Sequence, residues 1–237
     1  QENLLKLIEI LLLHAVLPAK LTGLVKMKYT IIEDCSPYFI RFTHDGLEEF
    51  NTYVLSLYDK QDWDQCSRPR ALGFNHHKFD PTIGRDILAH SVISEEILLN
   101  HHRVSVFKSD PGLYYGAHKD GFANRFSINY ILKAMDDKCV TSWYSDEDLK
   151  KYSLNSLLLQ KNIARECVRF IKKNHTPLKS MVAKVNECIL FNTDIFHDWD
   201  NSESKNDRLV LTLRSPTPGS IYFEDVKKML FKQQYPY

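Results

Sequence analysis

Residues 113–120 read Leu-Tyr-Tyr-Gly-Ala-His-Lys-Asp, and this stretch decides the fold predicted for the chain. In an extended strand, side chains at positions i and i+2 project from the same face, so His118 and Asp120 can reach one ion. A second histidine, His197, follows 77 residues after Asp120. Two imidazoles and one carboxylate form the ligand set that holds a non-haem Fe(II) on one face and leaves its other positions open. These three residues are therefore the predicted metal ligands and catalytic centre.

Short segments rich in β-forming residues surround both parts of this motif. Turn residues at 109–112 precede the ligand pair, and Gly116 allows close approach of the backbone near the metal. The predicted strands cover residues 104–107, 125–133, 139–144 and 187–192. The ligand pair is thus expected within a mainly β core.

The segment from Arg208 to Arg214 reads Arg-Leu-Val-Leu-Thr-Leu-Arg and predicts one more strand. Strict alternation puts Arg208, Val210, Thr212 and Arg214 on one face and three leucines on the other. A buried charge requires a partner, so an arginine that points into a β core predicts a bound anion.

The pattern Tyr115-x-x-His118-x-Asp120, with His197 and Arg208 downstream, resembles the Fe(II)- and 2-oxoglutarate-dependent dioxygenases, most closely the prolyl-hydroxylase-like group. Phe107 stands where an aromatic residue usually begins the motif. The resemblance covers residues 100–216. It implies an α+β fold with a mainly β core, namely a double-stranded β-helix (jelly roll, cupin-like) with flanking helices.

The same resemblance implies Fe(II) as the metal, 2-oxoglutarate as co-substrate and O2 as oxidant. Arg208 would pair with the 5-carboxylate of 2-oxoglutarate through the two-pronged geometry that guanidinium favours. Val210 stands where this superfamily often has a hydroxyl side chain, so a second contact is expected from Tyr115 or Asn129. Arg214 is a further candidate for this cofactor-binding set, with a surface role as its alternative.

The reaction implied is hydroxylation of a C–H bond in a small molecule or a peptidyl side chain, with release of succinate and CO2. A nucleic-acid dealkylase of the AlkB type is an alternative, because residues 208–214 match its Arg-x-Asn-x-Thr-x-Arg signature in three of four positions. The missing asparagine at Val210 and the near-neutral charge oppose it. A catalytically silent, cupin-like binding module is the third interpretation, and the complete ligand set opposes that one.

Length and charge restrict the remaining possibilities. A chain of 237 residues fits one domain with a sizeable core, and a net charge of +1 gives no general attraction to nucleic acid or to a membrane. The five cysteines show no CxxC pair and no zinc spacing, which favours a reducing, cytoplasmic environment.

Outside the motif the sequence predicts mainly helices and loops. Residues 1–26 are expected to form an N-terminal helical extension, in which the apolar run 4–17 is too short to span a membrane. Residues 27–237 are expected to form a single oxygenase domain. Within it we expect helices at 45–58, 94–99 and 146–173, a long loop at 62–79 and a polar loop at 199–207.

Overall fold

The computed structural model describes residues 28–61, 75–91, 101–120, 125–133, 136–147, 175–214 and 221–232, together with the single residues 63, 93, 97, 99 and 149. The predicted extension over residues 1–26 lies outside the described residues. So do most of the predicted helix at 94–99 and most of the predicted helical region at 146–173.

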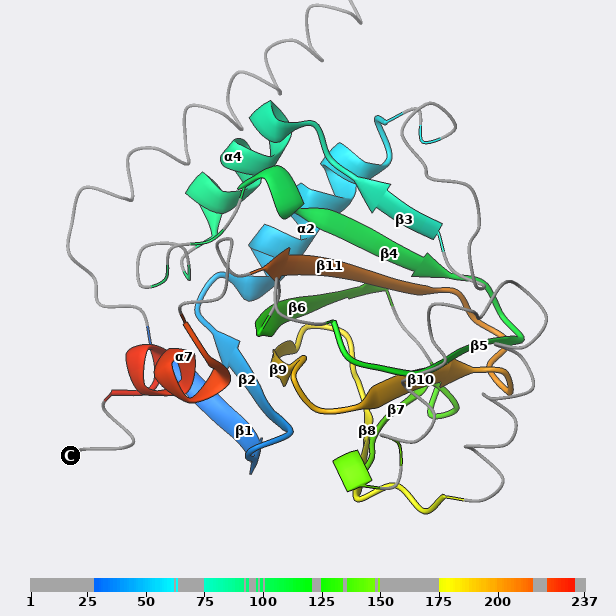
Figure 1. The fold of residues 1–237 in the computed structure, drawn as a ribbon. Coiled ribbons are helices and arrows are strands. Elements are labelled where there is room, and N and C mark those ends of the chain that lie inside the picture. Colours follow the sequence, from blue (N-terminus) through cyan, green and yellow to red (C-terminus); the bar gives the residue numbers. More distant parts are fainter. Residues whose placement is uncertain are drawn as a thin grey trace, which may run out of the picture.

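The described strands form two antiparallel sheets, shown in Figure 1. The larger sheet has the order β1-β2-β9-β6-β11-β4-β3 and the smaller sheet the order β5-β10-β7-β8. The strands are β1 (Tyr29–Cys35), β2 (Phe39–His44), β3 (Asn75–Lys78), β4 (Ser105–Ser109), β5 (Leu113–His118), β6 (Phe126–Lys133), β7 (Val140–Trp143), β8 (Lys179–Val182), β9 (Cys188–Asn192), β10 (His197–Asn201) and β11 (Arg208–Arg214).

The eight strands from β4 to β11 form the double-stranded β-helix that the sequence predicts. Four of them, β9, β6, β11 and β4, are neighbours in the larger sheet, and the other four make up the smaller sheet. The chain crosses between the sheets after β4, β5, β6, β8, β9 and β10, so, apart from β7 and β8, neighbouring strands of these eight are not consecutive in the chain. The predicted core over residues 100–216 encloses all eight strands.

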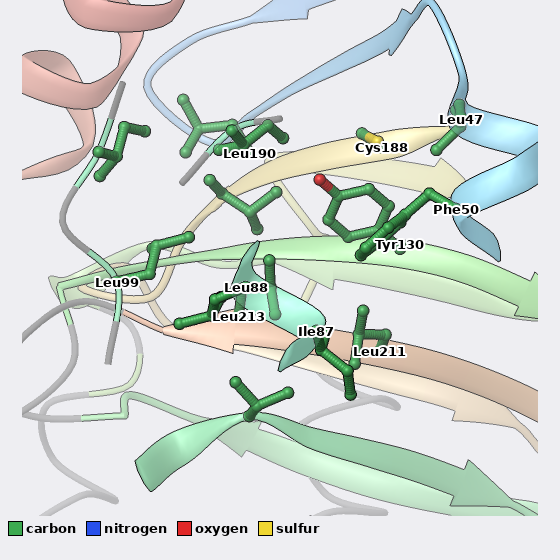
Figure 2. Packing of buried hydrophobic residues seen from close by; sticks show 14 of the residues in the cluster. Leu47, Phe50, Ile87, Leu88, Leu99, Tyr130, Cys188, Leu190, Leu211 and Leu213 are labelled. Atoms are coloured by element: carbon green, nitrogen blue, oxygen red, sulfur yellow. The ribbon is translucent and has the colours of Figure 1, made fainter. Parts of the chain in front are cut away.

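The leucine face of β11 forms the centre of the largest hydrophobic cluster. Leu209, Leu211 and Leu213 pack with residues of three described helices, α2 (Leu47–Tyr58), α4 (Pro81–His90) and α7 (Phe223–Leu230). Figure 2 shows Leu211 and Leu213 beside Ile87 and Leu88 of α4. In Figure 1, α2 and α4 lie on one side of β11 and the smaller sheet lies on the other. The helices therefore seal one face of the larger sheet and leave its other face to line the interior.

Two of the covering helices differ in how well the sequence predicts them. Helix α2 confirms the prediction at 45–58, whereas α4 is not predicted. The start of α4 has a clear local cause, because Asp80 accepts a hydrogen bond from the backbone N–H of Thr82 (2.8 Å) and Pro81 opens the first turn.

Both predicted loops are partly wrong. Strand β3 lies within the predicted loop at 62–79, and β10 takes in Trp199 to Asn201 from the predicted loop at 199–207. Both strands are rich in polar residues. Strand β3 pairs with β4, and β10 pairs with β5 and β7, so their backbone N–H and C=O groups form hydrogen bonds with these strands rather than with water. Their stability comes from strand partners that the local sequence does not reveal. No helix in the described part of the chain has the length and apolar character needed to cross a membrane.

The Leu211→Ala variant is expected to lower the free energy of unfolding by about 2–5 kcal/mol, because the side chain is 0% exposed and its loss leaves a cavity in the helix-facing core. Urea unfolding measures this difference. Leu178→Ala is the control, since Leu178 is 55% exposed and its loss should change stability by less than about 0.5 kcal/mol. Equal effects of the two substitutions would contradict the described packing.

Candidate active site and metal centre

The pairing of β5 with β10 brings the two candidate histidine ligands together. His118, the last residue of β5, is the register partner of His197, the first residue of β10, and their ring centres are 4.4 Å apart. Asp120 follows two residues after β5 and donates its backbone N–H to the carbonyl oxygen of Thr193 (3.2 Å), which holds it on the same side. The candidate ligand atoms of His118, Asp120 and His197 all lie within 4.8 Å of one another. This geometry suits one shared metal ion.

The backbone fixes the orientation of both imidazole rings. His118 Nδ1 lies 2.9 Å from the carbonyl oxygen of Gly116, and His197 Nδ1 lies 2.8 Å from that of Ile195. Because a carbonyl oxygen can only accept a hydrogen bond, each Nδ1 carries the proton and donates it. The lone pair of each Nε2 is then free for a metal, as metal-bound histidines require.

The electrostatics of the site favour the protonation states that a metal needs. Burial lowers the pKa of His197 to about 3, so its imidazole is neutral at pH 7. Burial opposes ionisation of Asp120, but the neighbouring His118 and His197 rings and the Arg214 guanidinium outweigh this effect. The pKa of Asp120 therefore lies well below its usual value, and the group presents a carboxylate.

A cavity of about 350 Å³ opens beside the three residues, and its walls come from both sheets. Phe107 and Asn129 line it from the larger sheet, and Tyr115 and Thr141 line it from the smaller one. Strand β11 presents four alternate residues to this space: Arg208, Val210, Thr212 and Arg214. The predicted alternation of this strand is therefore confirmed.

Arg208 is a buried cation without an acidic partner among the described residues. It is 8% exposed, and its Nη1 donates to Thr141 Oγ1 at 3.4 Å. Its guanidinium lies 5.6 Å from the centre of the Trp199 ring, a cation–π distance. The side chain is thus positioned in the cavity wall, and its charge calls for an anionic ligand.

The remaining predicted cofactor-binding residues also line this cavity. The Arg214 guanidinium lies 5.2 Å from the centre of the Phe107 ring, and Arg214 Nε and Asn129 Oδ1 are buried without a hydrogen-bond partner in the described part of the chain. Tyr115 packs edge-on against His118 with ring centres 4.4 Å apart, and burial raises the pKa of Tyr115 to about 12. Its hydroxyl therefore keeps its proton and can act as a donor. Arg214 is partly buried and lines the cavity, which favours a binding role over the alternative surface role.

A second group of polar residues, not predicted from the sequence, lies behind the histidine pair. The Asp198 carboxylate accepts hydrogen bonds from the hydroxyls of Tyr114 and Tyr144, each at 2.7 Å, and from the backbone N–H of Ser142 at 3.1 Å. Alternation puts Asp198 on the opposite face of β10 from His197. The group ties β10 to both of its neighbours. The alternation of polar residues after His197 is a sequence signal for a strand with a polar second face. It does not identify the tyrosine partners, because they are remote in sequence.

Comparison with known proteins supports the fold. No family model matches the sequence, and a search of curated proteins finds no match. Among solved structures, HygX from Streptomyces hygroscopicus, with nickel and 2-oxoglutarate bound, aligns with a TM-score of 0.52 and 9% identity over 76% of this chain and 83% of its own. SnoK, a non-haem α-ketoglutarate-dependent carbocyclase from nogalamycin biosynthesis, aligns with a TM-score of 0.51 and 9% identity over 75% and 80%.

These matches confirm at the level of fold the resemblance to 2-oxoglutarate- and Fe(II)-dependent oxygenases. A Pseudomonas putida prolyl-4-hydroxylase also aligns, with 10% identity over 76% of this chain and 93% of its own, but the TM-score is 0.44. That similarity is too low to support the narrower prolyl-hydroxylase-like assignment.

The Asp198→Asn variant is expected to have a flatter dependence of stability on pH than the natural protein. Burial raises the pKa of Asp198 to about 6, so the folded state binds this proton more tightly than the unfolded chain does. Its contribution to stability is therefore complete below about pH 4 and is lost as the pH rises through about 6, by up to about 3 kcal/mol. Asparagine removes this titration, and the tyrosine hydroxyls can turn to accept from its amide.

Urea unfolding between pH 4 and pH 7, with a chelator present, measures the difference between the two pH profiles. The Asp137→Asn variant serves as the control, since Asp137 is exposed. A pH profile of Asp198→Asn parallel to that of the natural protein would contradict the titration assigned to Asp198.

Proposed function

We propose that this protein is an Fe(II)- and 2-oxoglutarate-dependent dioxygenase that hydroxylates a C–H bond of a small molecule or a peptidyl side chain. One observation carries the proposal, namely the convergence of His118, Asp120 and His197 within 4.8 Å in a cavity that also receives Arg208, which has no acidic partner among the described residues. The fold alone would be insufficient, because one fold supports many functions. The ligand set and the anion site together give the proposal its chemical content.

The residues present fit ferrous iron. His118 and His197 would each provide Nε2, and Asp120 would provide a carboxylate oxygen, which is the donor set typical of non-haem Fe(II) oxygenases. No fourth histidine, cysteine or acid joins this cluster within the described residues, so positions remain open for co-substrate and oxygen. When bound, iron with 2-oxoglutarate and O2 supplies the oxidising chemistry, and 2-oxoglutarate is converted to succinate and CO2.

The protein's own contribution is to bind and orient the co-substrate. Arg208 would hold the 5-carboxylate of 2-oxoglutarate by two parallel N–H···O bonds. The hydrogen bond to Thr141 and the ring of Trp199 limit the motion of this guanidinium, which lowers the entropic cost of binding. Tyr115 and Asn129 are proposed to provide the further polar contacts, the first as a hydroxyl donor and the second through its amide.

Loss of a metal ligand tests the proposed function most directly. The His118→Ala variant is expected to lose at least about 100-fold in iron affinity and in succinate release from 2-oxoglutarate, because only two donors remain. Calorimetry and a succinate assay measure the two quantities. The control is His102→Ala, since His102 is exposed and does not line the cavity. Iron-dependent turnover retained by His118→Ala would refute the assignment.

The identity of the primary substrate is tested by screening amino acids, peptides and alkylated nucleotides for compounds that stimulate succinate release. Mass spectrometry of the product then tests the reaction type, since hydroxylation adds one oxygen atom whereas oxidative ring closure removes two hydrogens. Stimulation by alkylated nucleotides alone would replace the proposed substrate class with nucleic acid.

The Arg208→Gln variant is expected to raise the KM for 2-oxoglutarate by about 10–100-fold, because glutamine loses the charge-assisted pair with the 5-carboxylate. Arg208→Lys should lie between glutamine and the natural residue, since lysine keeps the charge but loses the fork. Arg85→Gln is the matched control, because Arg85 is exposed on α4. An unchanged KM in Arg208→Gln would exclude Arg208 as the carboxylate partner.

A further inference from the structure

The cavity contains a second arginine whose charge the proposed co-substrate does not balance. Arg208 and Arg214 are six residues apart, at opposite ends of the cavity face of β11. A strand of that length extends for about 20 Å, so the two guanidiniums start from well-separated points. Arg208 lies beside Thr141 and Trp199. Arg214 instead lies beside Phe107 and interacts electrostatically with the carboxylate of Asp120.

Arg214 has no acidic partner among the described residues to offset its partial burial. No described carboxylate forms an ion pair with it, its Nε has no hydrogen-bond partner among the described residues, and its guanidinium contacts the Phe107 ring. Burial lowers the pKa of Arg214 because the charge is removed from water. A partly buried guanidinium in this position gains most from an anion supplied by a ligand.

The neighbouring charges increase this requirement. Asp120 is the acid that interacts electrostatically with Arg214, but in the proposed function its carboxylate is a metal ligand and its charge is shared with the metal. Arg103, in the short helix η3 (His101–Arg103), lowers the pKa of Arg214 further by charge repulsion. Asp198 does not compensate them, because its carboxylate lies on the other face of β10 with two hydroxyls and one N–H donating to it.

A count of formal charges, which rests on the proposed function, leaves one positive charge over. Ferrous iron and Arg208 bring three positive charges, and Asp120 with the two carboxylates of 2-oxoglutarate brings three negative charges. Arg214 is additional to this balanced set. An uncompensated charge that is partly withdrawn from solvent is costly, so the primary substrate is the remaining source of an anion.

We propose that Arg214 binds a carboxylate group of the primary substrate and thereby holds it beside the metal ligands. The substrate class is therefore a small carboxylic acid. Apolar cavity residues, Phe107, Phe191 and Val210, provide the surface for its hydrocarbon part. Arginine recognises a carboxylate by a planar, two-pronged contact, which fixes direction as well as distance.

Binding of minimal anions tests this assignment even while the substrate itself is unidentified. The protein is loaded with Mn(II) and 2-oxoglutarate, and paramagnetic relaxation of added acetate, acetamide and inorganic phosphate is followed by NMR. We expect relaxation of the acetate methyl protons to exceed that of acetamide. The Arg214→Gln variant should weaken the acetate effect about tenfold or more, because the charged partner is lost.

Two variants guard against misreading this result. Arg214→Lys should retain part of the acetate relaxation, because lysine keeps the positive charge. Such a result would show that the weaker relaxation in Arg214→Gln reflects the lost charge. Arg85→Gln, the exposed control, should behave as the natural protein. Equal acetate relaxation in the natural protein and in Arg214→Gln overturns the proposal. Relaxation of phosphate but not of acetate through Arg214 overturns the carboxylate assignment and indicates a phosphorylated substrate.

The co-substrate provides the decisive comparison, since its own carboxylates are the alternative ligands for Arg214. The KM for 2-oxoglutarate is expected to rise at least about tenfold less in Arg214→Gln than in Arg208→Gln. Equal increases would assign Arg214 to 2-oxoglutarate and overturn the inference. Absence of iron-dependent succinate release in the natural protein would instead refute the proposed function, so the two failures are distinguishable.

Discussion

The antiparallel pairing of β5 with β10 is the interaction on which the candidate site depends. Because His118 and His197 are register partners, their side chains emerge from the same face of the smaller sheet. A shift of one residue in this pairing would turn His197 toward the opposite face and separate the two imidazoles. Contacts on the far side of the sheet oppose such a shift, since Tyr114 of β5 and Tyr144, the residue after β7, both hold Asp198.

Strand β11 connects the stability of the fold to the chemistry of the cavity. Its leucines pack against the helices on one face of the larger sheet, and its alternate residues line the interior space on the other. The same backbone therefore fixes the core and both arginines. The strand is paired on both sides, in one continuous register with β4 and with one irregularity, between Leu209 and Val210, in its pairing with β6. Such a strand can carry a buried arginine at one end and a partly buried arginine at the other because apolar packing stabilises its middle.

The sequence predicts those features whose cause is local. The ligand pair at His118 and Asp120 and the alternation along β11 follow from the period of a strand, and both appear in the structure. The polar strands β3 and β10 were missed because their stability comes from pairing with distant strands. The Asp198 group was missed for a similar reason, since its tyrosine partners are 84 and 54 residues away. Which of two arginines faces which ligand depends on the three-dimensional arrangement of charge, and spacing alone does not reveal it.

The hydrogen bonds from the two histidine rings to main-chain carbonyls have a consequence for how this protein can evolve. Each ring is held by the residue two positions before it, Gly116 or Ile195, through an atom that every amino acid possesses. Drift of the neighbouring side chains therefore leaves the direction of the imidazoles unchanged, provided that the strand path persists. An inherited backbone can preserve such a centre after nearly all other sequence likeness has disappeared.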